Sequence, residues 1–301
     1  MQVHLSNTTR AEHCHRRKKR LHDVLLHIES VRAPTMNQRV LRKRSAQMML
    51  RDQIDREMIF DPDHMSVKAR QASLDLVESL HYPGLVSSHS WSTVDAYPRI
   101  YHGGGFVTPY AGDSTGFVAK WRRHLGWANG RYYFGFGADI NGLGAQGDPR
   151  GAGVSNPVTY PFRGLGGVTI RKQHSGKRVY DINRDGVAQY GLYPDWIQDL
   201  RKVAGADGKA IVKDMARGAE GYLQMWERAE GVAPNACWNP DQRRSPAFFS
   251  ALDPGATTWQ VLQQAGQPDT RLGRSFTYCT SGPKMKVTFD AGGRLSGVAP
   301  A

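Results

Sequence analysis

Four short apolar runs, each followed by polar residues, divide the middle of this 301-residue chain. Their aromatic and β-branched residues are typical of buried strands, and the runs cover residues 59–60, 85–87, 106–108 and 132–137. Apolar residues at helical spacing occupy residues 67–80 and 117–125, and Ser66 can cap the first of these helices. Strands and helices that alternate at this spacing predict βαβ units and a parallel sheet.

A different pattern follows over residues 142–185, which are rich in Gly, Asn and Pro. The apolar positions around 168–170 and 179–180 predict a hairpin. A loop region of this length normally counts against a compact domain, unless it lines a site. Beyond it, Pro194 is tolerated in the first turn of a helix, and a second helix is predicted over residues 211–230.

The pattern of apolar and polar positions changes over the C-terminal residues 233–301, and it predicts a small α+β module there. Residues 233–240 read as a linker. The predicted elements after it are a helix at 259–265, strands at 275–279 and 285–289 joined by a turn, and a closing strand at Leu295.

The apolar residues of the N-terminal part have no regular spacing, but this part carries much of the positive charge. The whole chain has a net charge of +13, and residues 1–56 hold 13 Lys and Arg against 5 Asp and Glu. The densest run is Arg16–Arg20, and no aromatic residue interrupts it. This composition favours a solvated, poorly ordered leader at residues 1–36 over a nucleic-acid-binding arm. A loose helix is predicted after it, over residues 36–56.

The sequence contains no apolar run of 18 residues, so no membrane-spanning helix is predicted. The first residues lack the apolar stretch of a secretory signal, which predicts a cytoplasmic protein as encoded. The three cysteines form no Cys-x-x-Cys motif, which speaks against a thiolate zinc site. Cys237 and Cys279 could pair in an oxidising compartment, and Cys14 would then remain single.

Three potential metal ligands follow the predicted strands. His64 comes after the first run, His89 after the second and Asp139 after the fourth. Each alone is compatible with a structural role, as a hydrogen-bonded histidine or a turn-forming aspartate. Together they suit Zn²⁺, because imidazole and carboxylate are its usual ligands and strand ends of a (β/α) barrel meet at one face. An aspartate at such a site can also take a proton from bound water.

These motifs resemble the membrane (renal) dipeptidase family over about residues 40–165. The resemblance rests on the segment Phe60-Asp-Pro-Asp-His64-Met-Ser, on Ser88-His89-Ser90, and on Gly137-Ala-Asp139-Ile-Asn-Gly142. It implies a (β/α)8 TIM-type metallo-hydrolase barrel in which His64 and His89 bind one zinc of a pair. It also implies that Asp139 handles the proton of the bridging water, and that Arg99 and Asn141 contact a small peptide-like substrate.

The sequence departs from that family in one important respect. The family's barrel begins with a His-x-Asp pair, and a later strand supplies a glutamate that bridges two metals; neither is found here. The nearest motif is His13-Cys-His15, which lies among basic residues. We therefore expect a partial barrel over residues 37–232, fused to an unrelated leader, whose missing strands a partner chain could supply. The relatives with a similar Gly191–Asp195 segment form a secreted-type bacterial subgroup.

The C-terminal module has a resemblance of its own. Its Pro254–Val261 segment, its Gly266-Gln-Pro268 turn and its Tyr278 strand are similar to the small lipoprotein module of the outer-membrane barrel-assembly machinery. The predicted fold is thus α/β, a partial barrel followed by a small α+β module at residues 233–301.

Two functions follow from the sequence. The first is a zinc-dependent hydrolase of amide or peptide bonds, truncated and weakly active or inactive. The alternative is a non-catalytic remnant, or an interaction or envelope protein, built on the C-terminal module.

Overall fold

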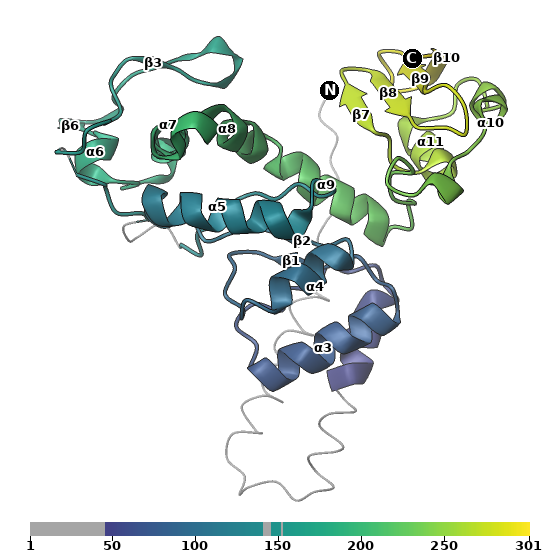
Figure 1. The fold of residues 1–301 in the computed structure, drawn as a ribbon, viewed down its shortest axis with the longest axis horizontal. Coiled ribbons are helices and arrows are strands. Elements are labelled where there is room, and N and C mark those ends of the chain that lie inside the picture. The colour runs from purple at the N-terminus through teal and green to yellow at the C-terminus, as the bar shows by residue number, and fades with distance from the viewer. Residues whose placement is uncertain (1–45, 141–145, 152) are drawn as a thin grey trace, which may run out of the picture. The chain divides into compact units, whose positions relative to one another are not determined.

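The computed structural model describes residues 46–140, 146–151 and 153–301 (Figure 1). The chain divides into two units, Met1–Arg51 and Asp52–Ala301, and the description below concerns the second. The basic leader at residues 1–36, with Cys14, lies outside the described residues. The helix predicted at residues 36–56 is observed over 46–54, within the described part.

Parallel strand segments in chain order form the first half of the second unit. Phe60 forms a parallel bridge with Leu85, and β1 (Val86–Ser87) pairs in parallel with β2 (Phe106–Val107). A fourth segment joins β2, because the N–H of Gly135 donates to the carbonyl of Val107 at 3.2 Å. A parallel bridge also links Tyr110 to Gly137. The predicted parallel pairing of these segments is confirmed.

Three helices connect these segments, α3 (Val67–Ser79), α4 (Ala96–His102) and α5 (Ser114–Ala128). Ser66 caps α3, as predicted, by accepting a hydrogen bond from the N–H of Ala69. Asp113 caps α5 in the same way, and Asn129 ends it in the left-handed conformation. Parallel strands with helical crossovers give a mixed α/β fold.

Two separate hairpins occupy the Gly-rich region. One pairs β3 (Phe162–Arg163) with β4 (Thr169–Ile170), and the other pairs β5 (His174–Ser175) with β6 (Arg178–Val179). The single hairpin predicted around 168–170 and 179–180 is therefore wrong, because each of these segments finds a nearer partner across a tight turn. The short elements around them are α6 (Ile182–Asp185) and the 3-10 turns Leu165–Gly167 and Tyr190–Leu192.

Three helices follow, α7 (Tyr193–Ala204), α8 (Gly208–Ala216) and α9 (Gly218–Ala229), with a 3-10 turn at Gly205–Asp207 between the first two. Pro194 lies in the first turn of α7, as predicted. The single helix predicted over residues 211–230 is interrupted at Arg217. The backbone at the start of α9 passes close to Gly135. A Cβ on Gly218, the first residue of α9, would lie 3.0 Å from the Cα of Gly135.

The C-terminal module contains a four-stranded antiparallel sheet and two helices, α10 (Pro246–Ser250) and α11 (Thr258–Ala265), after a 3-10 turn at Pro240–Gln242. The sheet order is β10-β9-β8-β7, and the strands are β7 (Thr270–Leu272), β8 (Ser275–Tyr278), β9 (Met285–Phe289) and β10 (Leu295–Pro300). Alternate residues of β8 and β9 are buried against the helices, together with Phe249 and Val261.

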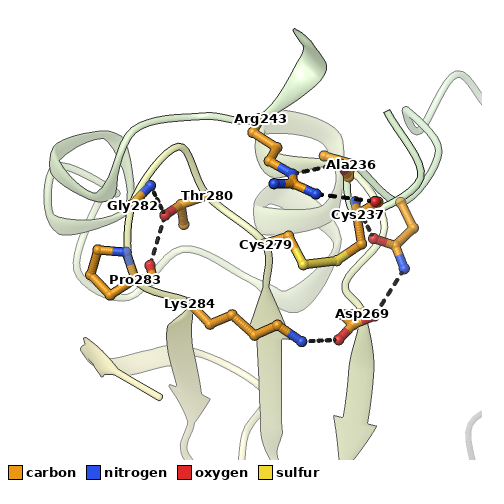
Figure 2. Close-up of a disulfide and its surroundings, with 10 residues drawn as sticks. Ala236, Cys237, Arg243, Asp269, Cys279, Thr280, Gly282, Pro283 and Lys284 are labelled. Carbon is orange, nitrogen blue, oxygen red and sulfur yellow. Dashed lines mark hydrogen bonds and ion pairs between the residues drawn. A yellow bond between two sulfur atoms is a disulfide. The ribbon is translucent and has the colours of Figure 1, made fainter. Parts of the chain in front are cut away.

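A disulfide fastens the segment before the module's helices to the end of β8 (Figure 2). The sulfurs of Cys237 and Cys279 are 2.09 Å apart, so the pairing that the sequence left open is present. Arg243 donates to the carbonyl of Cys237 at 3.2 Å, and Lys284 forms an ion pair with Asp269 at 2.6 Å. Within the described residues, no helix has both the length and the apolar character needed to cross a membrane.

Candidate metal centre

Three ligand-bearing side chains converge where the first, second and fourth parallel segments end. His64 follows the bridge at Phe60, His89 follows β1, and Asp139 follows Gly137. Nε2 of His64 lies 2.8 Å from Nε2 of His89, and Oδ2 of Asp139 lies 3.7 Å from each of these nitrogens. The structure therefore brings together the three residues that the sequence selected as a candidate site.

The spacing of these three atoms fits an ion of the size of zinc. A point equidistant from them lies about 2.0 Å from each, given separations of 2.8, 3.7 and 3.7 Å. Zinc bonds to imidazole nitrogen and carboxylate oxygen are about 2.0–2.2 Å long. Catalytic zinc sites typically have three protein ligands and one open position. The donor set fits one Zn²⁺ in chemistry and in distance.

Close packing of the fourth segment depends on Gly137. A Cβ at this position would lie 1.9 Å from the carbonyl oxygen of Ser88 and 2.8 Å from Oγ1 of Thr108. The N–H of Gly137 donates to the carbonyl of Pro109 at 3.2 Å. Because only glycine permits this approach, it sets the position from which Asp139 reaches the two histidines.

Asp63 holds His89 in place, and sequence reasoning did not single it out. Its side chain is only 1% exposed and accepts hydrogen bonds from the hydroxyls of Ser87 and Ser92 and from the N–H of His89. Its Oδ2 lies 3.6 Å from Nδ1 of His89, and the hydroxyl of Ser88 lies 2.8 Å from that nitrogen. Partners on the far ring nitrogen fix the orientation of a metal-binding histidine. The only sign of this role in the sequence is that Asp63 directly precedes His64, the first candidate ligand.

Left-handed backbone conformations gather at the site. Among the described residues, six that are not glycine have a positive φ, and three of them are His64 (62°), Ser90 (52°) and Asp139 (47°). Such conformations cost free energy and persist where surrounding contacts enforce them. Their presence at two of the three ligands is typical of a functional site.

The exposed Trp91 covers one side of the histidine pair. Its ring centroid lies 5.5 Å from that of His64 and 6.3 Å from that of His89. Its carbonyl accepts a hydrogen bond from the N–H of His64 at 3.2 Å. The side chains of His64 and Asp139 remain 54% and 57% exposed beside this ring, whereas that of His89 is only 9% exposed.

Two other groups of potential ligands within the described chain suit a metal less well. They are Asp61 with Asp63 and His89, and Cys237 with Asp269 and Cys279. In the first group Asp63 already accepts several hydrogen bonds. In the second group both sulfurs belong to the disulfide, and a thiolate is what binds metal.

The predicted substrate residues are not brought to the site in the same way. Arg99 lies on α4, where its guanidinium is 2.6 Å from Glu78 and 2.6 Å from Asp75 of α3. The hydrogen bond to Glu78 is the main reason that the pKa of Arg99 lies above its usual value. Binding a substrate carboxylate would require Arg99 to leave these two partners. Asn141 lies outside the described residues.

Comparison with known proteins identifies no relative of this chain. No family model, curated protein or solved structure matches it.

Proposed function

We propose that this chain is a zinc-dependent hydrolase of amide bonds in small, peptide-like molecules, built on a partial metallo-hydrolase barrel. The observation that supports the proposal most strongly is the convergence of His64, His89 and Asp139 at the ends of three of the four parallel segments. In folds of parallel strands with helical crossovers, ligand sites occupy this edge of the sheet.

Each residue of the metal centre has a separate role in the proposed reaction. His64 and His89 present Nε2 lone pairs to the ion, which requires both rings to be neutral. The hydroxyl of Ser88 contacts the other ring nitrogen of His89, and Asp63 holds the residue through its backbone N–H. A bound zinc ion supplies polarisation of water and of the substrate carbonyl. Asp139 would bind the ion through Oδ2, and its other carboxylate oxygen would accept a proton.

We expect a single zinc ion and low turnover. The group offers three ligand atoms within 4.8 Å of one another, which suffices for one ion with an open position. The His-x-Asp pair that provides further ligands in the dipeptidase family is missing from the sequence. A partner chain that supplied such ligands would raise the activity.

Metal analysis of the purified protein tests the proposal. After dialysis against Zn²⁺ and removal of free ion, we expect about one zinc per chain by mass spectrometry of the native protein. His64→Ala and His89→Ala should each lose it. His102→Ala is the matched control, because His102 is an exposed histidine at the end of α4. Zinc content that is negligible, or that falls equally in His102→Ala, would contradict the metal centre.

Activity requires a separate measurement. Release of free amino acids from a set of dipeptides should depend on Zn²⁺ and stop on chelation. Asp139→Asn should reduce the rate at saturating zinc, because the amide cannot accept the proton. A chain that binds zinc and hydrolyses none of these peptides would keep the metal centre and exclude the peptidase activity.

A second candidate function has one observation in its favour. The 2.8 Å contact between His64 and His89 is also the length of a structural hydrogen bond, in which one ring donates to the other. The chain would then be a non-catalytic interaction protein built on the C-terminal module, which has its own core and disulfide. Limited proteolysis would favour this function if residues 235–301 alone survived, and would oppose it if residues 60–230 were equally protected.

The disulfide also bears on where the protein works. Disulfides such as Cys237–Cys279 persist in oxidising compartments and are rare in the cytoplasm. We therefore propose an oxidising compartment for the folded protein, in contrast to the cytoplasm predicted from the sequence. Alkylation of the native protein from fractionated cells, without a reductant, tests this proposal. Modification of Cys237 and Cys279 would contradict it.

A further inference from the structure

A cavity separate from the metal centre lies between the β3–β4 hairpin and helices α7 and α8. Its volume is about 490 Å³, within the range of about 300–1,000 Å³ that is typical of small-molecule sites. Its walls are largely apolar, formed by Phe162, Leu165, Ile170, Pro194, Ile197 and Val212. None of these residues belongs to the metal centre.

The hairpin provides one wall through its register. Phe162 pairs directly with Ile170, so both side chains lie on the same face. Gly164 lies close beneath Ile170, since a Cβ there would be 2.6 Å from its Cδ1. Leu165 at the turn lines the cavity and is still 55% exposed. This apolar surface remains open to water in the described structure, and an occupant would cover it.

The charged residues around the cavity are all cationic. They are Arg163 on the hairpin, Arg201 in the last turn of α7 and Lys209 in the first turn of α8. The residues that line the cavity include no Asp or Glu. Among the described residues, neither Arg201 nor Lys209 forms an ion pair.

The position of Lys209 also favours an anionic ligand. The N-terminal turn of a helix carries partial positive charge, so it favours an anion and disfavours a cation. Lys209 adds a positive charge at this turn of α8 and lines the same cavity as Arg201 of α7, while the N-cap residue Asp207 pairs with Arg122. A negatively charged group bound in the cavity would neutralise both cationic side chains.

We propose that this cavity binds a small anionic amphiphile, a molecule with a carboxylate head and an aliphatic tail. The tail would lie against Ile170, Ile197 and Val212, and the head against Arg201 and Lys209. Charge complementarity and the limited volume favour this ligand over an acidic peptide or a second copy of the chain. The proposal is independent of the metal centre and of its activity.

Calorimetric titration with three ten-carbon probes tests the charge requirement. Decanoate should bind, whereas decanol and decyltrimethylammonium, which have tails of the same length, should bind at least about tenfold more weakly. Affinity should rise about tenfold for each two methylenes from hexanoate to decanoate, because each buried methylene contributes about 0.8 kcal/mol. Equal binding of the three ten-carbon probes would overturn the proposal.

Variants locate the binding. Arg201→Gln and Lys209→Gln should each weaken decanoate about three- to fivefold, and Val212→Glu, which places a carboxylate on the wall, should abolish it. Lys213→Gln is the matched control, because Lys213 is exposed on α8 and does not line the cavity. A loss in Lys213→Gln equal to that in Lys209→Gln would overturn the proposal.

Two further outcomes would also contradict a small-molecule site. Self-association that Val212→Glu abolishes, with no binding of decanoate, would assign the cavity to a second copy. Binding of an acidic peptide in place of decanoate would assign it to a protein partner. If Val212→Glu fails to fold, the two surface glutamine variants still decide, because Arg201 and Lys209 are exposed.

Discussion

The parallel region at residues 60–140 and the C-terminal module at 233–301 are built in opposite ways. In the module, strands of three to six residues form a four-stranded antiparallel sheet over one apolar core. In the parallel region, β1 and β2 have two residues each, and the outer segments join by bridges. The strands of the parallel region are therefore short, and polar residues follow directly after them. His64 and His89 are among these residues.

The backbone shows the same difference. Positive φ angles in the module occur at glycine, for example Gly266 (80°) and Gly273 (57°), which adopts them at little cost. In the parallel region His64 and Asp139 adopt them with full side chains. The backbone of the module is therefore unstrained at these turns, whereas the backbone of the parallel region is strained at the candidate ligands.

The largest expected effect separates the two cores. Phe249 in the module and Phe117 in α5 are both 1% exposed. Replacing either by Ala should cost about 4 kcal/mol through the cavity left behind. Hydrogen exchange should show Phe249→Ala loosening the module while zinc binding persists, and Phe117→Ala loosening residues 60–140 with loss of zinc. Loss of protection in both regions from either change would mean that they unfold as one unit.

Opening the disulfide should affect the module alone. Cys237 and Cys279 are 42 residues apart in sequence, and a cross-link of this kind typically contributes about 3 kcal/mol. The double Ser variant should lower the free energy of unfolding of the module by that amount, as measured by denaturant titration. The matched measurement is the zinc content at His64 and His89, which should not change. A loss of zinc in this variant would show that the metal centre depends on the module.

Acid should weaken the parallel region selectively. His124 is buried in α5 beside the hydroxyl of Tyr101, and burial lowers its pKa to about 3. The unfolded chain takes up the proton near pH 6.5 and the folded chain does not, so stability falls as the pH drops below that value. The expected loss is about 2 kcal/mol between pH 6.5 and 5. His124→Gln should flatten this dependence in denaturation series at each pH.

The module provides the internal control for this experiment, because residues 233–301 contain no histidine. Its denaturation midpoint should stay constant between pH 6.5 and 5. An equal loss in the module, or an unchanged slope in His124→Gln, would contradict the assignment of the pH dependence to His124.

The smallest expected effect compares one helix cap from each region. Ser66 accepts a hydrogen bond from the N–H of Ala69 in α3, and Thr257 forms a capping box with Gln260 in α11. Replacing either residue by Ala should cost about 1 kcal/mol. Thermal melts of both variants should agree within that value, since caps act locally in either kind of fold. A much larger loss in one variant would show that its cap stabilises more of the region than its own helix.

Local rules predicted the module more closely than the region before it. The predicted strand at residues 285–289 coincides with β9, because alternation of buried and exposed residues fixes a half-buried strand. Short strand β7 was missed, since Thr270–Leu272 follows a Gly-Gln-Pro turn and its Leu272 is 82% exposed. An edge strand with an exposed apolar residue carries no alternating signal.

In the parallel region the sequence predicted which residues meet but not what holds them. His64, His89 and Asp139 were found because each follows an apolar run, a pattern that the sequence displays directly. The supporting role of Asp63 depends on distant hydroxyls and could not be deduced from spacing. The ion pairs of Arg99 likewise depend on how α3 packs beside α4.

The indole of Trp91 gives the histidine pair an optical property. Because its ring lies within 5.5 Å of His64 and 6.3 Å of His89, its excited state is sensitive to the charge on either imidazole. Its emission therefore reports, without any label, whether those rings are neutral, protonated or engaged. The difference spectrum against Trp91→Phe isolates this signal from the other six tryptophans of the chain.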